Sequence, residues 1–238
     1  MAETHGDTRR QYVRRMFGRI APRYDLLNRL MTFGQDQRWR HDLVAAATIP
    51  ANAVILDLGT GTGDLALEIQ MRHPDALVVA ADLTPEMMQI GKTRHPDAQL
   101  QWVLADADHL PFPPDCFDNI VSGFLLRNLG NLPHALREQQ RVLKADGDWH
   151  ALDTTPPADN LLQPFIRFYL HVIVPLLGFI IAGDRAAYEY LPETTEHFLQ
   201  PDALLDRLGT AGFHDASAQA RMFGTVAIYH ARKPQLLP

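Results

Sequence analysis

The stretch Val54-Ile55-Leu56-Asp57-Leu58-Gly59-Thr60-Gly61-Thr62-Gly63-Asp64 decides the fold of this chain of 238 residues. The apolar run 54–58 predicts a buried strand, the glycines predict a tight turn, and Asp64 begins a helix whose first N–H groups are unpaired. The next apolar run, 77–82, ends in Asp82, whose carboxylate could accept both hydroxyls of a ribose. The pattern predicts the nucleotide-binding half of a doubly wound α/β sheet, and a glycine turn without a ligand is the alternative.

The residue at position 64 indicates which nucleotide binds. A dinucleotide motif, G-x-G-x-x-G, would place its third glycine there, but the chain has Asp64. An acid at a helix N-terminus repels a pyrophosphate, which needs positive potential. A cation with a ribose and an amino-acid end suits the site better, and S-adenosylmethionine fits that description. The same acid disfavours a nicotinamide oxidoreductase.

Composition and charge exclude several classes of function. The formal net charge is −6 and there is no long basic tract, so nucleic acid is not expected as the main partner. The single cysteine, Cys116, cannot form an internal disulfide, and the N-terminus lacks an apolar signal segment. We therefore expect one domain in the cytoplasm.

The N-terminal region differs from the rest of the chain in its charge. Residues 9–40 contain nine arginines against two acids, Asp25 and Asp36. Val13, Phe17 and Ile20 recur among them at helical spacing and predict a basic amphipathic helix. This helix could lie on an anionic membrane surface, or it could pack on the domain through its apolar stripe.

The order of the expected elements predicts a parallel sheet with helical crossovers. We expect strands at about 53–58, 77–82, 100–104, 117–122 and 147–153, helices near 64–72, 86–94, 131–144 and 203–211, and a closing antiparallel hairpin at 214–220 and 225–231. The resulting fold class is α/β, with seven strands. The single domain, 1–238, divides into a basic helical cap (1–50), a cofactor-binding core (51–155), a lid insertion (156–200) and a closing helix and hairpin (201–238).

The inserted block contains a strongly apolar segment, 161–182. Arg167 interrupts it, Pro164 and Pro175 are expected to break it, and its longest stretch without Asp, Glu, Lys or Arg is only 168–183. These features argue against a membrane span. Because ligands bind at the carboxyl ends of the strands in open α/β sheets, we expect an apolar lid over a lipophilic substrate. A helix that only covers the sheet is the alternative.

With the glycine turn, the lid and the basic helical cap considered together, the chain resembles the ubiquinone/menaquinone biosynthesis C-methyltransferase family, from about Phe17 to Lys233. This family belongs to the class I S-adenosylmethionine-dependent methyltransferases. The likeness is carried by Tyr24-Asp25-Leu26-Leu27-Asn28 with Gly34 and Trp39, by Leu126-Arg127-Asn128, by Arg141-Val142-Leu143-Lys144, and by Ala187-Tyr188-Glu189-Tyr190-Leu191-Pro192.

The chain also departs from the family pattern at several positions. Leu27, Thr32 and Asp36 stand where the family has Met, Ser and His. Lys144-Ala145-Asp146-Gly147 replaces Lys-Pro-Gly-Gly, Asp153-Thr154-Thr155 replaces Glu-x-Ser, and Gly123 replaces a serine that contacts the cofactor.

The resemblance implies S-adenosylmethionine-dependent C-methylation of a polyprenylated quinol ring, with demethylmenaquinol as the first expectation. Three alternatives stay open: a polyprenyl benzoquinol on the ubiquinone route, another prenylated or polyketide aromatic, and a non-catalytic cofactor-binding partner in a quinone-synthesis complex. The expected cofactor-binding residues are Asp57, Gly59, Thr60, Gly61, Thr62, Asp82, Leu83, Asp106, Ala107 and Gly123. Asp106 could instead be a simple turn residue.

The expected catalytic residues are Arg127, which would stabilise a developing phenolate, and Asn128, which would orient the ring. Arg127 could instead be a structural ion-pair partner. The proton acceptor stays open among Tyr24, Asp25, His171 and water. The expected substrate-binding residues are Tyr24, Asn28, Arg127, His171 and Tyr188.

We expect no metal, because no Cys/His cluster has ligand spacing and His171, His197, His214 and His230 are scattered. The expected partner is a lipophilic quinol. A homodimer, and peripheral contact with the inner face of the membrane through the basic helix and the apolar lid, stay open.

Overall fold

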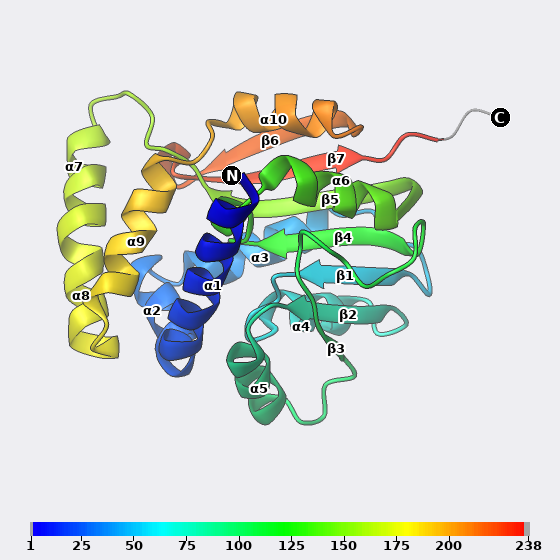
Figure 1. Cartoon of the computed structure of the whole chain (residues 1–238), viewed down its shortest axis with the longest axis horizontal. Helices are drawn as coiled ribbons and strands as arrows, with labels where there is room; N and C mark the ends of the chain where they lie inside the picture. The colour runs from blue at the N-terminus through cyan, green and yellow to red at the C-terminus, as the bar shows by residue number, and fades with distance from the viewer. Residues whose placement is uncertain (1, 236–238) are drawn as a thin grey trace.

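The computed structural model describes residues 2–235, and in this range seven strands form one sheet in the order β3-β2-β1-β4-β5-β7-β6 (Figure 1). The strands are β1 (Val54–Leu58), β2 (Leu77–Asp82), β3 (Gln101–Leu104), β4 (Phe117–Gly123), β5 (Leu143–Thr154), β6 (His214–Arg221) and β7 (Val226–Arg232). The first five are parallel, and β7 runs antiparallel to both β5 and β6. The α/β prediction, with its closing antiparallel hairpin, is confirmed.

Helices cover both faces of the sheet, so most side chains of the central strands are buried whichever face they lie on. On one face Leu136 of α6 (Leu132–Val142) and Leu208 of α10 (Pro201–Thr210) belong to the core cluster of Trp149. On the other face, Leu43 of α3 (Gln35–Ala46) and Ile69 of α4 (Asp64–Arg72) pack with Ile55. The helix α5 (Pro85–Arg94) follows β2, and the 3-10 turns η2 (Leu126–Asn128) and η4 (Met222–Gly224) follow β4 and β6.

The boundary between α6 and β5 differs from the expectation. The helix ends at Val142 rather than at position 144, and β5 already begins at Leu143. Leu143 pairs with Phe117 of β4, so the early start of the strand is set by a tertiary contact that local periodicity does not report.

The N-terminal head is packed on the domain. It consists of α1 (Ala2–Ile20), η1 (Ala21–Arg23) and α2 (Tyr24–Met31). Met16 and Ile20 of α1 are buried in a cluster with Val174 and Tyr188. The expected apolar stripe therefore faces the protein. Arg19 of the head is also engaged, since its Nε lies 2.9 Å from Asp184 Oδ2.

The lid is a helical hairpin made of α7 (Gln163–Phe168), η3 (Tyr169–Ile173), α8 (Val174–Ala182) and α9 (Arg185–Glu196). The first three pieces form one continuous helix, so the expectation that Pro175 breaks the segment is wrong. A π turn over Tyr169–Ile173 precedes Pro175, which then stands in the first turn of α8. Because a π turn inserts one extra residue, it accommodates the missing N–H of the proline. Pro164 stands in the first turn of α7, where no helical bond is lost.

The helix Gln163–Ala182 forms the outermost layer of the molecule, and α9 lies between it and the sheet (Figure 1). It has 20 residues, and an 18-residue window of it has a mean hydropathy of 2.1 with only 17% of the window buried, so by length and composition it could cross a membrane. It is attached to α9 by a close contact: a Cβ built on Gly178 would lie 2.2 Å from Tyr188 Cγ.

Candidate functional site

The residues that follow the first four strands surround a cavity of about 100 Å³. Seven of the ten expected cofactor residues line it: Gly59, Gly61, Asp82, Leu83, Asp106, Ala107 and Gly123. Asp57, Thr60 and Thr62 are buried and do not line it. Their side chains instead form hydrogen bonds that hold the glycine turn in place.

The glycine turn needs its glycines for backbone shape and for space. Gly63 has φ +92°, and a Cβ there would lie 2.7 Å from Trp102 Cη2. Beneath the turn, Asp57 Oδ2 accepts hydrogen bonds from Thr60 Oγ1 (2.6 Å) and from the N–H of Ala66 in α4 (3.0 Å). Burial raises the pKa of Asp57 to about 7. Its Oδ1 is buried and has no partner among the described residues.

Asp82 is arranged to bind hydroxyl groups. Its carboxylate accepts the N–H groups of Gly61 (2.8 Å) and Thr84 (2.7 Å), and it lines the cavity. Burial raises its pKa. Each carboxylate oxygen keeps a further lone pair for a ribose hydroxyl.

The helix α1 closes this cavity, which the sequence did not reveal. Arg10, Val13, Arg14 and Phe17 line it, and their spacing puts them on one face of the helix. Arg10 forms an ion pair with Asp106. The N–H of Asp108 also donates to Asp106 Oδ1 (3.0 Å), so Asp106 is at once a turn residue and part of the cavity wall.

A second cavity of about 370 Å³ lies between the head and the lid. Tyr24, Asn28, Arg127 and Tyr188, four of the five expected substrate residues, line it. Most of the remaining wall is apolar, with contributions from Met16, Ile20, Met31, Phe165, Leu170, Val174 and Leu191. Its volume and character suit a lipophilic aromatic ring.

One wall separates the two cavities, because Phe17, Tyr24, Phe124 and Asn128 line both of them. Phe124 has a positive φ of 60°, a strained conformation for a residue with a side chain. Asn128 Nδ2 donates to the carbonyl of Phe124 (3.0 Å), and the Arg127 guanidinium lies 5.5 Å from the Phe124 ring centroid. A group that moved from a ligand in one cavity to a ligand in the other would cross this wall. Phe124 was not singled out in the sequence analysis.

Arg127 is buried and forms an ion pair with Asp153, which is itself fully buried. Asp153 also accepts the N–H of Arg127 at 3.3 Å. Among the described residues Arg127 Nε has no partner. Arg127 therefore has a structural ion-pair partner and also lines the apolar cavity, while its expected catalytic role stays a prediction. Asp153 positions it there.

The three side chains considered as proton acceptors occupy different places. Tyr24 lines both cavities, and burial raises the pKa of its phenol. Asp25 lies outside them, because its carboxylate accepts Thr62 Oγ1 (2.9 Å) and pairs with Arg94. Of the side chains, only Tyr24 can reach a ligand there.

His171, an expected substrate-binding residue, lies away from the other four. His171 and Arg167 do share one helical face, but both turn to Glu196 of α9, at 3.1 and 3.3 Å. His171 does not line the apolar cavity. The polar stripe of the lid is therefore used to attach α7 to α9.

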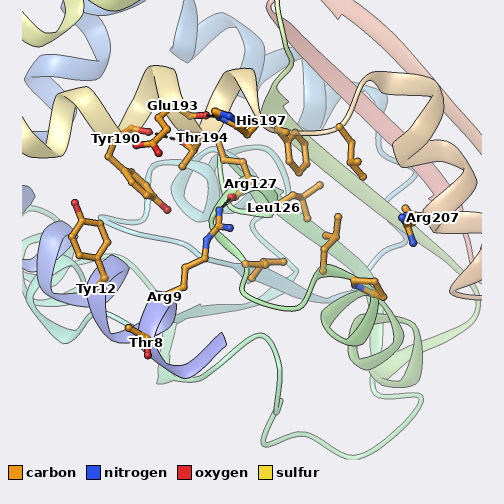
Figure 2. Close-up of a pocket in the computed structure, with 15 residues that line it drawn as sticks. Thr8, Arg9, Tyr12, Leu126, Arg127, Tyr190, Glu193, Thr194, His197 and Arg207 are labelled. Atoms are coloured by element: carbon orange, nitrogen blue, oxygen red, sulfur yellow. Dashed lines mark hydrogen bonds between the residues drawn. The ribbon is translucent and has the colours of Figure 1, made fainter. Parts of the chain in front are cut away.

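An open cleft of about 1080 Å³ adjoins the apolar cavity (Figure 2). Arg127, Tyr190 and Thr194 line both. In the cleft, Arg9 of α1 donates to the carbonyl of Arg127 at 2.6 Å. This bond joins the head to the turn that carries Arg127 and Asn128.

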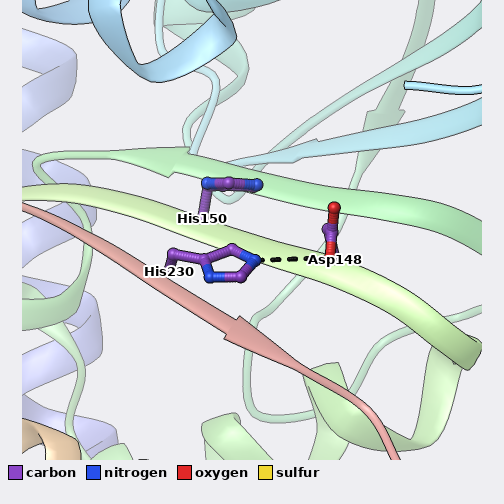
Figure 3. Close-up of side chains that lie close together, drawn as sticks. All are labelled: Asp148, His150 and His230. Carbon is purple, nitrogen blue, oxygen red and sulfur yellow. Dashed lines mark hydrogen bonds and ion pairs between the residues drawn. The ribbon is translucent and has the colours of Figure 1, made fainter. Parts of the chain in front are cut away.

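A cluster away from these cavities could offer ligands to a metal. Asp148, His150 and His230 have one ligand atom each within 4.8 Å of one another (Figure 3). However, His230 Nε2 lies 3.3 Å from Asp148 Oδ1, and Arg232 Nε lies 3.0 Å from the same oxygen. A guanidinium so close already balances the carboxylate and would repel a divalent cation. The arrangement favours an ion-pair cluster. His230, one of the four histidines described as scattered in the sequence analysis, lies beside His150, which was not singled out there.

Comparison with known proteins gives consistent results. The model of the ubiE/COQ5 methyltransferase family matches residues 5–233. A ubiquinone/menaquinone biosynthesis C-methyltransferase UbiE of Desulfotalea psychrophila is 43% identical, over 91% of this chain and 88% of the relative. A demethylmenaquinone methyltransferase of Thermus thermophilus is 42% identical, over 92% of this chain and 100% of the relative.

Two solved structures show the same fold. A Haloferax volcanii methyltransferase in complex with its Trm112 activator has a TM-score of 0.69 and 16% identity, covering 92% of this chain and 98% of that one. A Haemonchus contortus phosphoethanolamine N-methyltransferase 2 in complex with S-adenosyl-L-methionine has a TM-score of 0.65 and 14% identity, covering 83% and 53%. At these identities the likeness concerns the fold alone.

Proposed function

Because the chain belongs to the ubiE/COQ5 methyltransferase family, we propose that it methylates a ring carbon of a polyprenylated quinol, with demethylmenaquinol as the substrate. The chain is a methyltransferase that uses S-adenosylmethionine. The observation that carries the substrate proposal is the apolar cavity of about 370 Å³ against the wall it shares with the cofactor cavity. A relative named for both quinones makes a demethylated benzoquinol the second candidate.

The residues of the smaller cavity fit S-adenosylmethionine. The glycine turn leaves room for its amino-acid end, and the unpartnered Oδ1 of Asp57 lies beneath. Asp82 would hold the ribose, while Leu83, Asp106 and Ala107 would hold the adenine. When bound, this cofactor supplies an electrophilic methyl group.

The residues of the apolar cavity prepare the acceptor carbon. Arg127, positioned by Asp153, would stabilise the negative charge that develops on the ring oxygen when the hydroxyl proton leaves. Tyr24 is the side chain that could relay this proton, directly or through one water. Asn128 and Phe124 would align the ring with the methyl group, and the lid would exclude water.

In this proposal the segments 1–50, 51–155, 156–200 and 201–238 act as cap, cofactor core, lid and closing unit of one domain. Residues 236–238 of the last segment, like Met1, lie outside the described range. We expect the protein in the cytoplasm, where the quinol is reached from the membrane surface.

The test is incubation of the purified protein with S-adenosylmethionine and either reduced demethylmenaquinone or a reduced demethylated benzoquinone, followed by mass spectrometry. The proposal expects a gain of one methylene with the first substrate. A gain with the benzoquinol alone would shift the assignment to the ubiquinone route. Cofactor binding without methylation of either quinol would favour another aromatic acceptor or the non-catalytic alternative.

A further inference from the structure

The outward side of the lid is apolar and exposed. We define the outer lid face by Phe165, Phe168, Val172, Leu176, Phe179 and Ile180. Each of these side chains is exposed, with Phe165 at 73% and Ile180 at 67%. From Leu161 to Gly183 the only Asp, Glu, Lys or Arg is Arg167. A monomer in water rarely presents such a continuous apolar strip without a partner.

The apolar cavity opens at this face. Leu162 and Phe165 of the lid, Phe33 after α2, and Phe223 in η4 all line the cavity and are also exposed. These four residues come from separate parts of the chain, so the fold gathers them around one mouth. A ligand that is apolar along its whole length could pass from the outer lid face into the cavity without entering water.

The rim of the face is cationic. Arg23 donates to the carbonyl of Ile181 at the end of α8, and Arg29 is exposed on α2 beside the exposed Leu26 and Leu30. The helix α2 packs against α8. Two acids near this face are already paired: Asp184 with Arg19, and Glu196 with Arg167 and His171. The chain is acidic as a whole, so this local excess of arginine favours an anionic partner.

We propose that the outer lid face docks in the plane of an anionic lipid bilayer, with the arginine rim at the headgroups and the cavity mouth against the hydrocarbon. An interfacial helix of this kind buries one apolar side and keeps its other side on the protein. The contact between Gly178 and Tyr188 and the burial of Val174 hold the inner side on α9, which a spanning helix would have to leave. The route for the quinol tail rests on the proposed function; the docking itself does not.

The experiment compares two double variants of the full chain. Phe168→Glu with Phe179→Glu places charges on the outer lid face at positions that do not line the cavity. Met71→Glu with Leu77→Glu is the matched control, since these residues are equally apolar and exposed but lie on α4 and β2. Flotation with phosphatidylcholine vesicles, with and without phosphatidylglycerol, measures docking, and thermal unfolding checks that each variant folds.

We expect the wild type and the control to float with the vesicles, more strongly with the anionic lipid. The outer-face variant should lose binding by at least about tenfold, because each charge removes the burial of a phenyl ring. Methylation of a polyprenylated quinol in vesicles should fall with it. Methylation of the same ring with a truncated, water-soluble side chain should stay within about twofold of the wild type.

Three results would overturn the docking proposal. The first is a wild type that stays at the bottom of the gradient, and the second is an outer-face variant that floats like the wild type. The third is a wild-type dimer in solution that the outer-face variant converts to a monomer, which would assign the face to a second copy of the chain. Flotation without methylation of either form of the quinol would leave docking supported and reject the proposed function.

Discussion

Arg127 joins the structural and the chemical parts of the site. It is held by the buried carboxylate of Asp153, its carbonyl accepts a hydrogen bond from Arg9, and its side chain lines the apolar cavity. Removing the charge would leave Asp153 buried and unpaired, so a conservative substitution is the informative one.

For Arg127→Lys we expect kcat to fall by about a hundredfold, with KM for the quinol changed by less than about threefold. A lysine keeps the positive charge, but it lacks the planar set of N–H donors with which the guanidinium could hydrogen-bond Asp153 and a ring oxygen at the same time. Steady-state kinetics with a saturating methyl donor measures both constants. A change confined to KM would show that Arg127 binds the substrate without stabilising the developing charge.

Asp82→Ala should weaken S-adenosylmethionine binding by at least about tenfold, since hydrogen bonds to a charged acceptor contribute about 1.5–3 kcal/mol each. The expectation rests on the free lone pairs of this carboxylate and on its support of Gly61. Isothermal titration calorimetry measures the affinity. Unchanged affinity would contradict the ribose assignment; Asp75→Ala, at an exposed acid that does not line the cofactor cavity, is the control.

At the level of elements, the contact between α8 and α9 decides the shape of the apolar cavity. In Gly178→Ala the new Cβ would fall 2.2 Å from Tyr188 Cγ, an atom at the base of its side chain, so the helices must separate. We expect a loss of about 1–3 kcal/mol in the free energy of unfolding, together with a higher KM for the quinol.

Gly209→Ala in α10 is the matched control for this change. Nothing lies within 4 Å of the added Cβ, so we expect a gain of about 0.5–1 kcal/mol from the lower backbone entropy of the unfolded chain. Urea unfolding of both variants measures the difference. Equal stability changes in the two variants would contradict the close packing of α8 on α9.

The pairing of β5 with β7 makes the fold sensitive to acid. His150 is 1% exposed, and burial lowers its pKa to about 4, with the charge of His230 adding to the effect and Asp148 opposing it. The unfolded chain takes up this proton near pH 6.5 and the folded chain only near pH 4, so stability falls as the pH drops through that interval.

The full effect of His150 is about 3 kcal/mol, from the difference between these two pKa values. In His150→Leu, whose side chain does not titrate, we expect a smaller loss of stability between pH 7 and pH 5 than in the wild type. Chemical unfolding at both pH values measures it. Identical losses would place the acid sensitivity elsewhere.

At the scale of the whole molecule, α1 closes the cofactor cavity. The cavity of about 100 Å³ is well below the 300 Å³ or more that ligand sites usually provide, and α1 forms one of its walls. We infer that α1 moves outward to admit the cofactor. Hydrogen exchange of residues 9–20 should therefore slow by about tenfold or more when S-adenosylmethionine binds, while α10 stays unchanged. Equal exchange of α1 with and without the cofactor would contradict this motion.

Much of the molecule was predictable because local patterns carry it. Short continuous apolar runs bounded by turns located the strands. The carboxylate of Asp82 at the end of β2 located the cofactor cavity. Other features were not predictable, for two reasons. The choice of Asp153 as the partner of Arg127, the closure of the cavity by α1 and the contact of His171 with Glu196 join segments far apart in the chain, which periodicity does not encode. The π turn before Pro175 and the positive φ of Phe124 are local, but no sequence motif indicates them.

The wall made by Phe17, Tyr24, Phe124 and Asn128 has a kinetic consequence. If the outer lid face docks on a bilayer as proposed, this wall would separate a ligand that enters from water from a ligand that enters from lipid. The demethylated cofactor could then be replaced from the aqueous side while the quinol stays bound, and neither ligand would block the entrance of the other. Such an enzyme would bind its two substrates in random order. It would complete many turnovers before it dissociates from the bilayer.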